Sequence, residues 1–175
     1  MQLNLVIDCK YNNNKTSNYM AARVKHKIDL KHETNAQELI FSLSKMQSWL
    51  EILIANQEND YNDFSKWLLT DGFVSNLLKR MSIMQMAKEF GHSNAPKITK
   101  WLYEIYDDIF NLHLEKPELF TTGNGIAQRY FVSENETYAN LYYCLPVIPR
   151  KYEEIRIPFL KAKFGIDFFW VCKVD

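Results

Sequence analysis

Hydrophobic and polar residues alternate near the start of the chain, a pattern that predicts β-structure. Leu3, Leu5 and Ile7 alternate with polar residues, so a strand is predicted over residues 3–10. A second alternating stretch covers residues 19–31. The asparagine-rich segment between the two stretches tolerates turn conformations, and a β-hairpin is therefore expected.

Alternation returns in the C-terminal third of the chain. It predicts a hairpin over residues 129–145, with Ala139 and Leu141 on its core face, and strands within 153–159 and 165–174. The residues from Phe168 to Val171 are four consecutive apolar residues. An uninterrupted apolar run is typical of a strand that is covered on both faces.

Between these β regions, apolar residues recur every three or four positions, which predicts helices. Four are expected: residues 34–56, a short one around 64–68, one ending at Gly91, and 96–114 with Pro96 near its first position. Thr34 to Gln37 (TNAQ) has the spacing of a capping box at the start of the first helix. Asp71–Gly72 is expected to interrupt the helical region.

This order of elements predicts an α+β fold. The expected sheet is mostly antiparallel and is built from N- and C-terminal strands, with the central four-helix segment packed against it. Residues 1–175 are interpreted as a single domain. The alternative is a separate helical lobe over residues 34–116.

Composition and charge narrow the classes of function. Lys plus Arg and Asp plus Glu are 21 each, and this zero net charge disfavours a non-specific nucleic-acid binder. Three isolated cysteines predict neither a zinc site nor a disulfide framework, and no metal or cofactor is expected. No apolar run of about 18 residues and no leader are seen, so a cytoplasmic location without a membrane partner is expected.

Aromatic residues on the predicted C-terminal hairpin are the candidate protein-binding site, because Tyr and Arg are favoured where proteins bind each other. The candidates are Arg129, Tyr130, Tyr138, Asn140 and Tyr142. The leading interpretation is a small intracellular regulator or inhibitor that binds another protein. The alternative is that the rings pack beneath helices.

The number of lysines (16) and asparagines (15) indicates A/T-rich codons, as in many phages and mobile elements. This composition suggests an inhibitor that acts on a host system.

Residues 81–102 resemble a helix-turn-helix and supply the second hypothesis, sequence-specific DNA binding. The candidate contacts with nucleic acid are Lys88, His92, Lys97 and Lys100. The alternative is two structural helices joined by a capped turn. The second predicted strand offers a further basic face for an anion, formed by Arg23, Lys25, Lys27 and Lys31, or simply a solvated outer face.

The chain carries no recognised catalytic motif such as GxSxG, a phosphate loop or HExxH, which favours a non-enzymatic role. The third hypothesis is a small hydrolase or nuclease whose site is assembled from distant residues. It predicts a polar pocket lined by groups with shifted pKa values.

Overall fold

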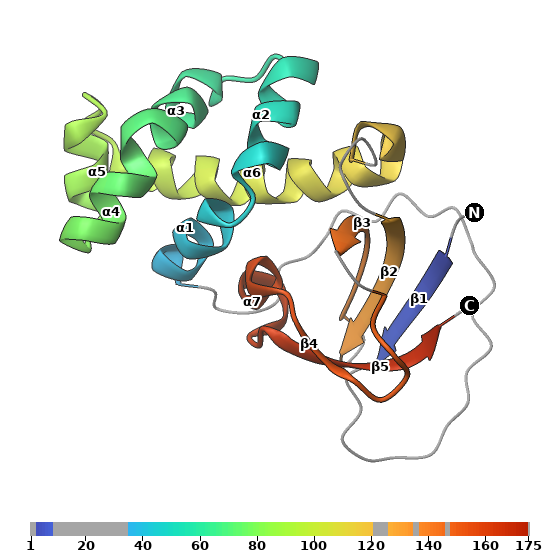
Figure 1. Cartoon of the computed structure of the whole chain (residues 1–175). Helices are drawn as coiled ribbons and strands as arrows, with labels where there is room; N and C mark the ends of the chain where they lie inside the picture. The colour runs from blue at the N-terminus through green and yellow to red at the C-terminus, as the bar shows by residue number, and fades with distance from the viewer. Residues whose placement is uncertain (1–2, 9–34, 121–125, 135–136, 146–147, 175) are drawn as a thin grey trace.

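A five-stranded sheet and a group of helices lie side by side, which makes this an α+β protein (Figure 1). The computed structural model describes residues 3–8, 35–120, 126–134, 137–145 and 148–174. The second predicted strand, with Arg23, Lys25, Lys27 and Lys31, lies outside these residues.

The strands are β1 (Leu3–Asp8), β2 (Ile126–Glu134), β3 (Thr137–Leu145), β4 (Glu154–Arg156) and β5 (Phe168–Val174). The helices are α1 (Ala36–Ser44), α2 (Gln47–Asn56), α3 (Asn62–Trp67), α4 (Phe73–Lys79), α5 (Ile83–Glu89), α6 (Ala95–Glu115) and α7 (Lys161–Phe164). Three short turns complete the list: the π-helical η1 (Leu68–Gly72) and the 3₁₀-helical η2 (Pro117–Phe120) and η3 (Pro158–Leu160).

The sheet has the strand order β3-β2-β1-β5-β4. β2 and β3 form the antiparallel hairpin predicted from the alternation, and Ala139 and Leu141 are buried as expected. β5 is also antiparallel to both of its neighbours. β1 lies in the middle and pairs with β2 in parallel. Parallel neighbours need a long crossover, and here the helical region lies between the two strands in the sequence.

The first predicted helix is two helices, α1 and α2, separated at Lys45 and Met46. Met46 is buried in the core, so the chain turns inward at this point. The predicted capping box is wrong in detail, because the N-cap is Asn35, whose side chain accepts a hydrogen bond from the backbone N–H of Gln37 at 2.7 Å. The Gln37 side chain instead donates to the carbonyl of Met81, at 2.5 Å.

The predicted interruption at Asp71–Gly72 is also wrong. α3, η1 and α4 form one continuous helical segment, in which a π-turn accommodates the glycine. The break comes later, at Arg80, which has left-handed backbone angles, and Ser82 then starts α5 with a capping box. Gly91 (φ 81°) ends this helix as predicted.

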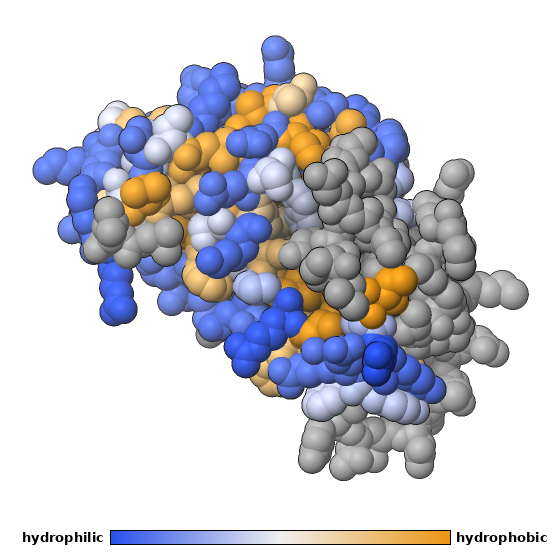
Figure 2. All heavy atoms as spheres, viewed as in Figure 1, coloured by the Kyte–Doolittle hydropathy of each residue, from blue (hydrophilic) through white to orange (hydrophobic). Residues whose placement is uncertain are grey.

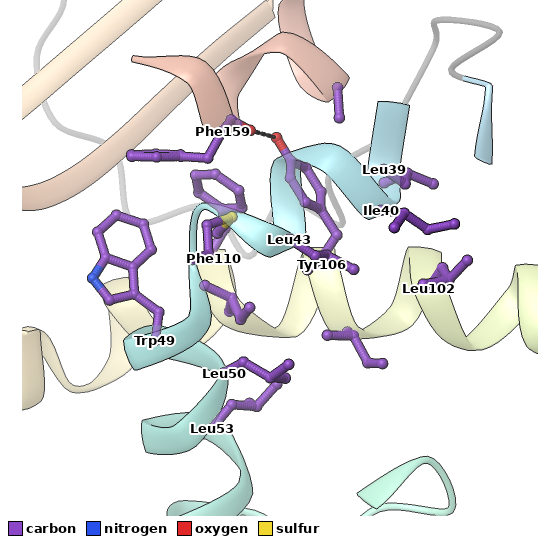
Figure 3. Packing of buried hydrophobic residues seen from close by; sticks show 14 of the residues in the cluster. Leu39, Ile40, Leu43, Trp49, Leu50, Leu53, Leu102, Tyr106, Phe110 and Phe159 are labelled. Atoms are coloured by element: carbon purple, nitrogen blue, oxygen red, sulfur yellow. Dashed lines mark hydrogen bonds between the residues drawn. The ribbon is translucent and has the colours of Figure 1, made fainter. Parts of the chain in front are cut away.

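The longest helix, α6, passes through the middle of the helical lobe and reaches β3 (Figure 1). The apolar stripe predicted for it is buried, including Ile98, Leu102, Ile105 and Ile109. A single cluster of buried hydrophobic residues extends from these helices to β5. Figure 3 shows how the Tyr106 hydroxyl donates to the carbonyl of Phe159 in η3, at 2.9 Å, and so ties α6 to the segment before β5.

Candidate functional site

β5 presents two different faces. Phe169 and Val171 are buried, and the Phe169 ring lies 5.6 Å from that of Phe164 in α7. The alternate residues, Phe168 and Trp170, retain 43% and 50% of their accessible surface. The prediction that this strand is covered on both faces is therefore wrong, because the described helices pack on one face only at this point.

A third exposed ring lies at the same edge of the sheet, beside β5. Tyr152 is 70% exposed and stands in the turn before β4, with a left-handed φ of 69° that is costly for a large side chain. Its backbone N–H donates to the carbonyl of Val171 at 2.6 Å, which fixes it beside β5. We call Tyr152, Phe168 and Trp170 the aromatic corner.

Charged residues border the aromatic corner. In the β4–β5 pairing, Glu154 lies opposite Trp170, and Arg156 lies opposite Phe168. Arg156 and Glu154 approach each other to 4.0 Å. This arrangement of exposed rings with a charged border resembles the apolar centre and polar rim of protein interfaces.

The predicted protein-binding residues lie on the other half of the same sheet, in the β2–β3 hairpin. The register pairs Arg129 with Tyr142. It pairs the next residue, Tyr130, with the buried Leu141, so Arg129 and Tyr130 occupy alternate positions of β2. Tyr142 is half-buried and packs against the core. For Arg129, Tyr130, Tyr138 and Asn140, only the backbone is described.

The residues of the predicted nucleic-acid site are grouped around the turn between α5 and α6, and are Lys88, His92, Lys97 and Lys100. Lys88 and His92 line an open hollow of about 380 Å³. The structure thus places these side chains on two consecutive helices and the turn between them.

Two of these lysines are engaged within the protein. The Nζ of Lys97 lies 4.6 Å from the centre of the Trp101 ring, and that of Lys100 lies 3.1 Å from the carboxylate of Glu104. The start of α6 buries Ile98 but exposes Pro96, Lys97 and Lys100, so one face of this helix is open, as a recognition helix requires.

Titratable groups with shifted pKa values occur inside the protein. Burial lowers the pKa of Lys163 to about 8 and raises that of Asp107 to about 6, while their mutual attraction opposes both shifts. Burial also lowers the pKa of His113 to about 4. None of the three lines the α5–α6 hollow or the hollow between α1, α4 and α5, so they form no open catalytic pocket there.

No group of three or more His, Cys, Asp or Glu side chains is placed to hold a metal ion among the described residues. Of the helices in the described ranges, none is both long and apolar enough to cross a membrane. Comparison of the chain with protein-family models, curated proteins and solved structures gives no match.

The apolar run from Phe168 to Val171 is the signal for the aromatic corner in the sequence. Four apolar residues in a row fit a strand buried on both faces, but they equally fit a strand with an apolar docking face. Glu154 and Arg156 in the preceding strand are charged and lie opposite Trp170 and Phe168. Residues that lie opposite each other on paired strands share a face of the sheet, so these charges favour an exposed face.

Proposed function

We propose that this protein is a small regulator or inhibitor that binds another protein, and that the aromatic corner is its docking surface. The observation that carries the proposal is the exposure of Phe168 and Trp170, which are alternate residues of β5, and of Tyr152, whose backbone N–H bonds to β5 at the same edge of the sheet. Isolated exposed apolar residues are ordinary, but a group of rings on one surface is typical of an interaction site.

The chemistry of the corner suits a protein partner. Each aromatic side chain can bury about 150–250 Å² and loses little conformational freedom on binding. Arg156 lies beside the rings, and Arg, Trp and Tyr are the residues that most often dominate binding energy. The proposal includes Tyr142 and Arg129 of the hairpin as a second contact on the same sheet.

The cellular setting is part of the proposal and rests on composition alone. The excess of lysine over arginine and the many asparagines suit a phage or mobile-element gene, and therefore an inhibitor of a host system in the cytoplasm.

The test is a comparison of tagged variants as bait in a native lysate, followed by binding measurements with the purified partner. Trp170→Lys places a charge in the corner and is expected to weaken binding at least about tenfold. Met84→Lys is the matched control, because Met84 is also exposed but lies on α5, away from the sheet. It should leave binding unchanged, and both variants should keep the wild-type circular dichroism.

A partner that is retained by wild-type protein and by Met84→Lys but lost by Trp170→Lys supports the proposal. Equal retention by all three proteins would contradict it. Tyr142→Ala, tested in the same assay, separates the hairpin contact from the aromatic corner.

Sequence-specific DNA binding is the second candidate, supported by the grouping of Lys88, His92, Lys97 and Lys100 at one turn. It predicts an affinity that falls steeply with salt and is reduced by Lys88→Gln. Treating half of the lysate with nuclease separates the two candidates, because a protein partner survives the treatment and a nucleic acid does not.

A further inference from the structure

A second open hollow lies among the helices. It has a volume of about 700 Å³ and lies where α1, the end of α4 and the start of α5 meet. α4 and α5 form the left end of the molecule in Figure 1, where Figure 2 shows hydrophilic and hydrophobic side chains intermixed on the face shown. Its lining residues are Gln37, Phe41, Asn76, Arg80, Ser82 and Gln85.

Arg80, one of the residues that line this hollow, has an unfavourable backbone conformation. Its φ and ψ are 47° and 50°, the left-handed region that glycine or asparagine usually occupies at the end of a helix. Its backbone N–H donates to the carbonyl of Asn76 at 2.8 Å, which closes α4. A glycine would serve this role without the steric cost, so the backbone alone does not explain an arginine here.

The positive charge of Arg80 is the second feature of this hollow. Within the described part of the chain, no carboxylate lies within 4.0 Å of its guanidinium group. The preceding residue, Lys79, differs in this respect, because its Nζ lies 3.3 Å from the carboxylate of Glu89. Arg80 is exposed at the mouth of the hollow, where a guanidinium group can form paired hydrogen bonds with an oxyanion.

The amide side chains around Arg80 are fixed. Gln37 and Asn76 both donate to the carbonyl of Met81, at 2.5 and 3.3 Å, and so hold the backbone next to Arg80. The Gln85 oxygen accepts from the backbone N–H of Ser82 at 2.8 Å. The amide nitrogen of Gln85 therefore remains as a second donor in the hollow.

An apolar surface completes the site. Phe41 is 40% exposed in the hollow, and the Nζ of Lys45 lies 5.2 Å from the centre of its ring. A flat group can rest on the part of this ring that Lys45 leaves exposed, while the charged end of the ligand meets Arg80. We propose that the hollow binds an oxyanion, a carboxylate or a phosphate, that is attached to a flat apolar group.

The test is a titration of the whole ¹⁵N-labelled protein, followed by NMR, with benzoate, phenyl phosphate and the uncharged analogue benzyl alcohol. Saturable shifts are expected at the side-chain amide of Gln85 and the backbone N–H of Arg80 with at least one of the two anions. The anion that binds with the higher affinity shows whether the site prefers a carboxylate or a phosphate. Benzyl alcohol should give no saturable shift.

Arg80→Gln should weaken the binding of the preferred anion by at least about tenfold. The matched control is Lys79→Gln, which removes the neighbouring charge and should change affinity less than about twofold. Arg80→Gly should lose binding and yet raise the midpoint of thermal unfolding by about 2–4 °C, since glycine relieves the backbone strain.

Three results would overturn the proposal. They are no saturable shift with either anion, equal binding of benzyl alcohol, or equal losses for Arg80→Gln and Lys79→Gln. The last would indicate attraction by general positive charge instead of a site built around Arg80.

Discussion

Lys163 is a charged residue in an environment that disfavours its charge. It is 2% exposed, and its Nζ lies 5.6 Å from the centre of the Phe110 ring. Its pKa falls from 10.5 to about 8 on folding, so stability should rise with pH between these values as the folded protein sheds the proton. The pKa of Asp107 rises from 3.8 to about 6, so stability is lost as pH increases through this range. Both groups therefore oppose folding most strongly between about pH 6 and 8.

Lys163→Met is predicted to stabilise the protein at pH 7, because it removes a charge that burial disfavours and keeps most of the side-chain volume. Asp107 loses the attraction of Lys163 in this variant, so its pKa rises further and the carboxyl group takes up a proton instead of remaining as an unpaired charge. A gain of about 1 kcal/mol would raise the midpoint of thermal unfolding by about 2–4 °C. The variant should also lose the increase in stability between pH 8 and 10.5. Thermal unfolding followed by circular dichroism at pH 7 and pH 10 measures both effects.

Lys161→Met is the control, since Lys161 lies on the same short helix but is only half-buried. It should retain the wild-type pH dependence. A lower unfolding midpoint for Lys163→Met at pH 7, with the alkaline increase preserved, would show that the buried charge stabilises the fold.

Residue burial was predictable from the sequence only where spacing determines it. The stripe of Ile98, Leu102, Ile105 and Ile109 on α6 follows from helical periodicity and is buried. The burial of Lys163 does not follow from any local pattern, because it depends on the packing of α7 against α6, two helices that are distant in the sequence.

At the scale of elements, the π-turn within the α3–α4 segment depends on Gly72. A Cβ atom at this position would lie 2.8 Å from Cζ3 of Trp67 and 2.9 Å from Cδ2 of Leu68, closer than such atoms can approach. Replacing glycine with alanine inside a helix normally stabilises it by up to about 1 kcal/mol. Here Gly72→Ala is predicted to destabilise the protein by about 1–3 kcal/mol, because the two side chains must move.

Urea unfolding of Gly72→Ala against wild-type protein tests this prediction. Thr70→Ala, an exposed substitution in the same turn, controls for helix propensity and should be neutral or slightly stabilising. Stabilisation of Gly72→Ala would mean that the surrounding rings accommodate the methyl group without cost.

The errors in predicting elements have a common physical cause. Gly72 has the local chemistry of a helix breaker, but close packing against Trp67 makes it a helix residue. Met46 has good helix propensity, yet it lies between α1 and α2 and is buried in the core. In both cases tertiary packing overrides local preference. Helix ends that depend on a single turn of backbone, such as those marked by Gly91 and Pro96, were predicted correctly.

At the scale of the whole molecule, His113 lies where the helices meet the sheet. Its ring stacks on Phe120 of η2 with 3.4 Å between ring centres, and Trp49 of α2 contacts it at 4.2 Å. Its Nδ1 lies 2.9 Å from the carbonyl of Ile109, and the backbone of Tyr142 in β3 also favours the protonated ring. Burial outweighs these backbone contributions and lowers the pKa from 6.5 to about 4, so protonation of this ring opposes the folded state.

His113 is therefore predicted to make the protein sensitive to acid. The unfolded chain binds the proton more tightly than the folded protein, so the contribution of His113 is complete above pH 6.5 and is lost as pH falls towards 4. The loss should be roughly 2–3 kcal/mol.

Asp107 contributes with the opposite sign between pH 6 and 3.8, but this residue is present in both the wild-type protein and the His113→Gln variant. The difference between their unfolding free energies, measured in urea at pH 7, 5.5 and 4, isolates the histidine. His113→Gln should be less stable at pH 7, because it loses the stacking, and this deficit should shrink at pH 4. His92→Gln should keep the wild-type acid profile. A deficit for His113→Gln that is equal at all three pH values would mean that charging His113 does not weaken the contact between the helices and the sheet.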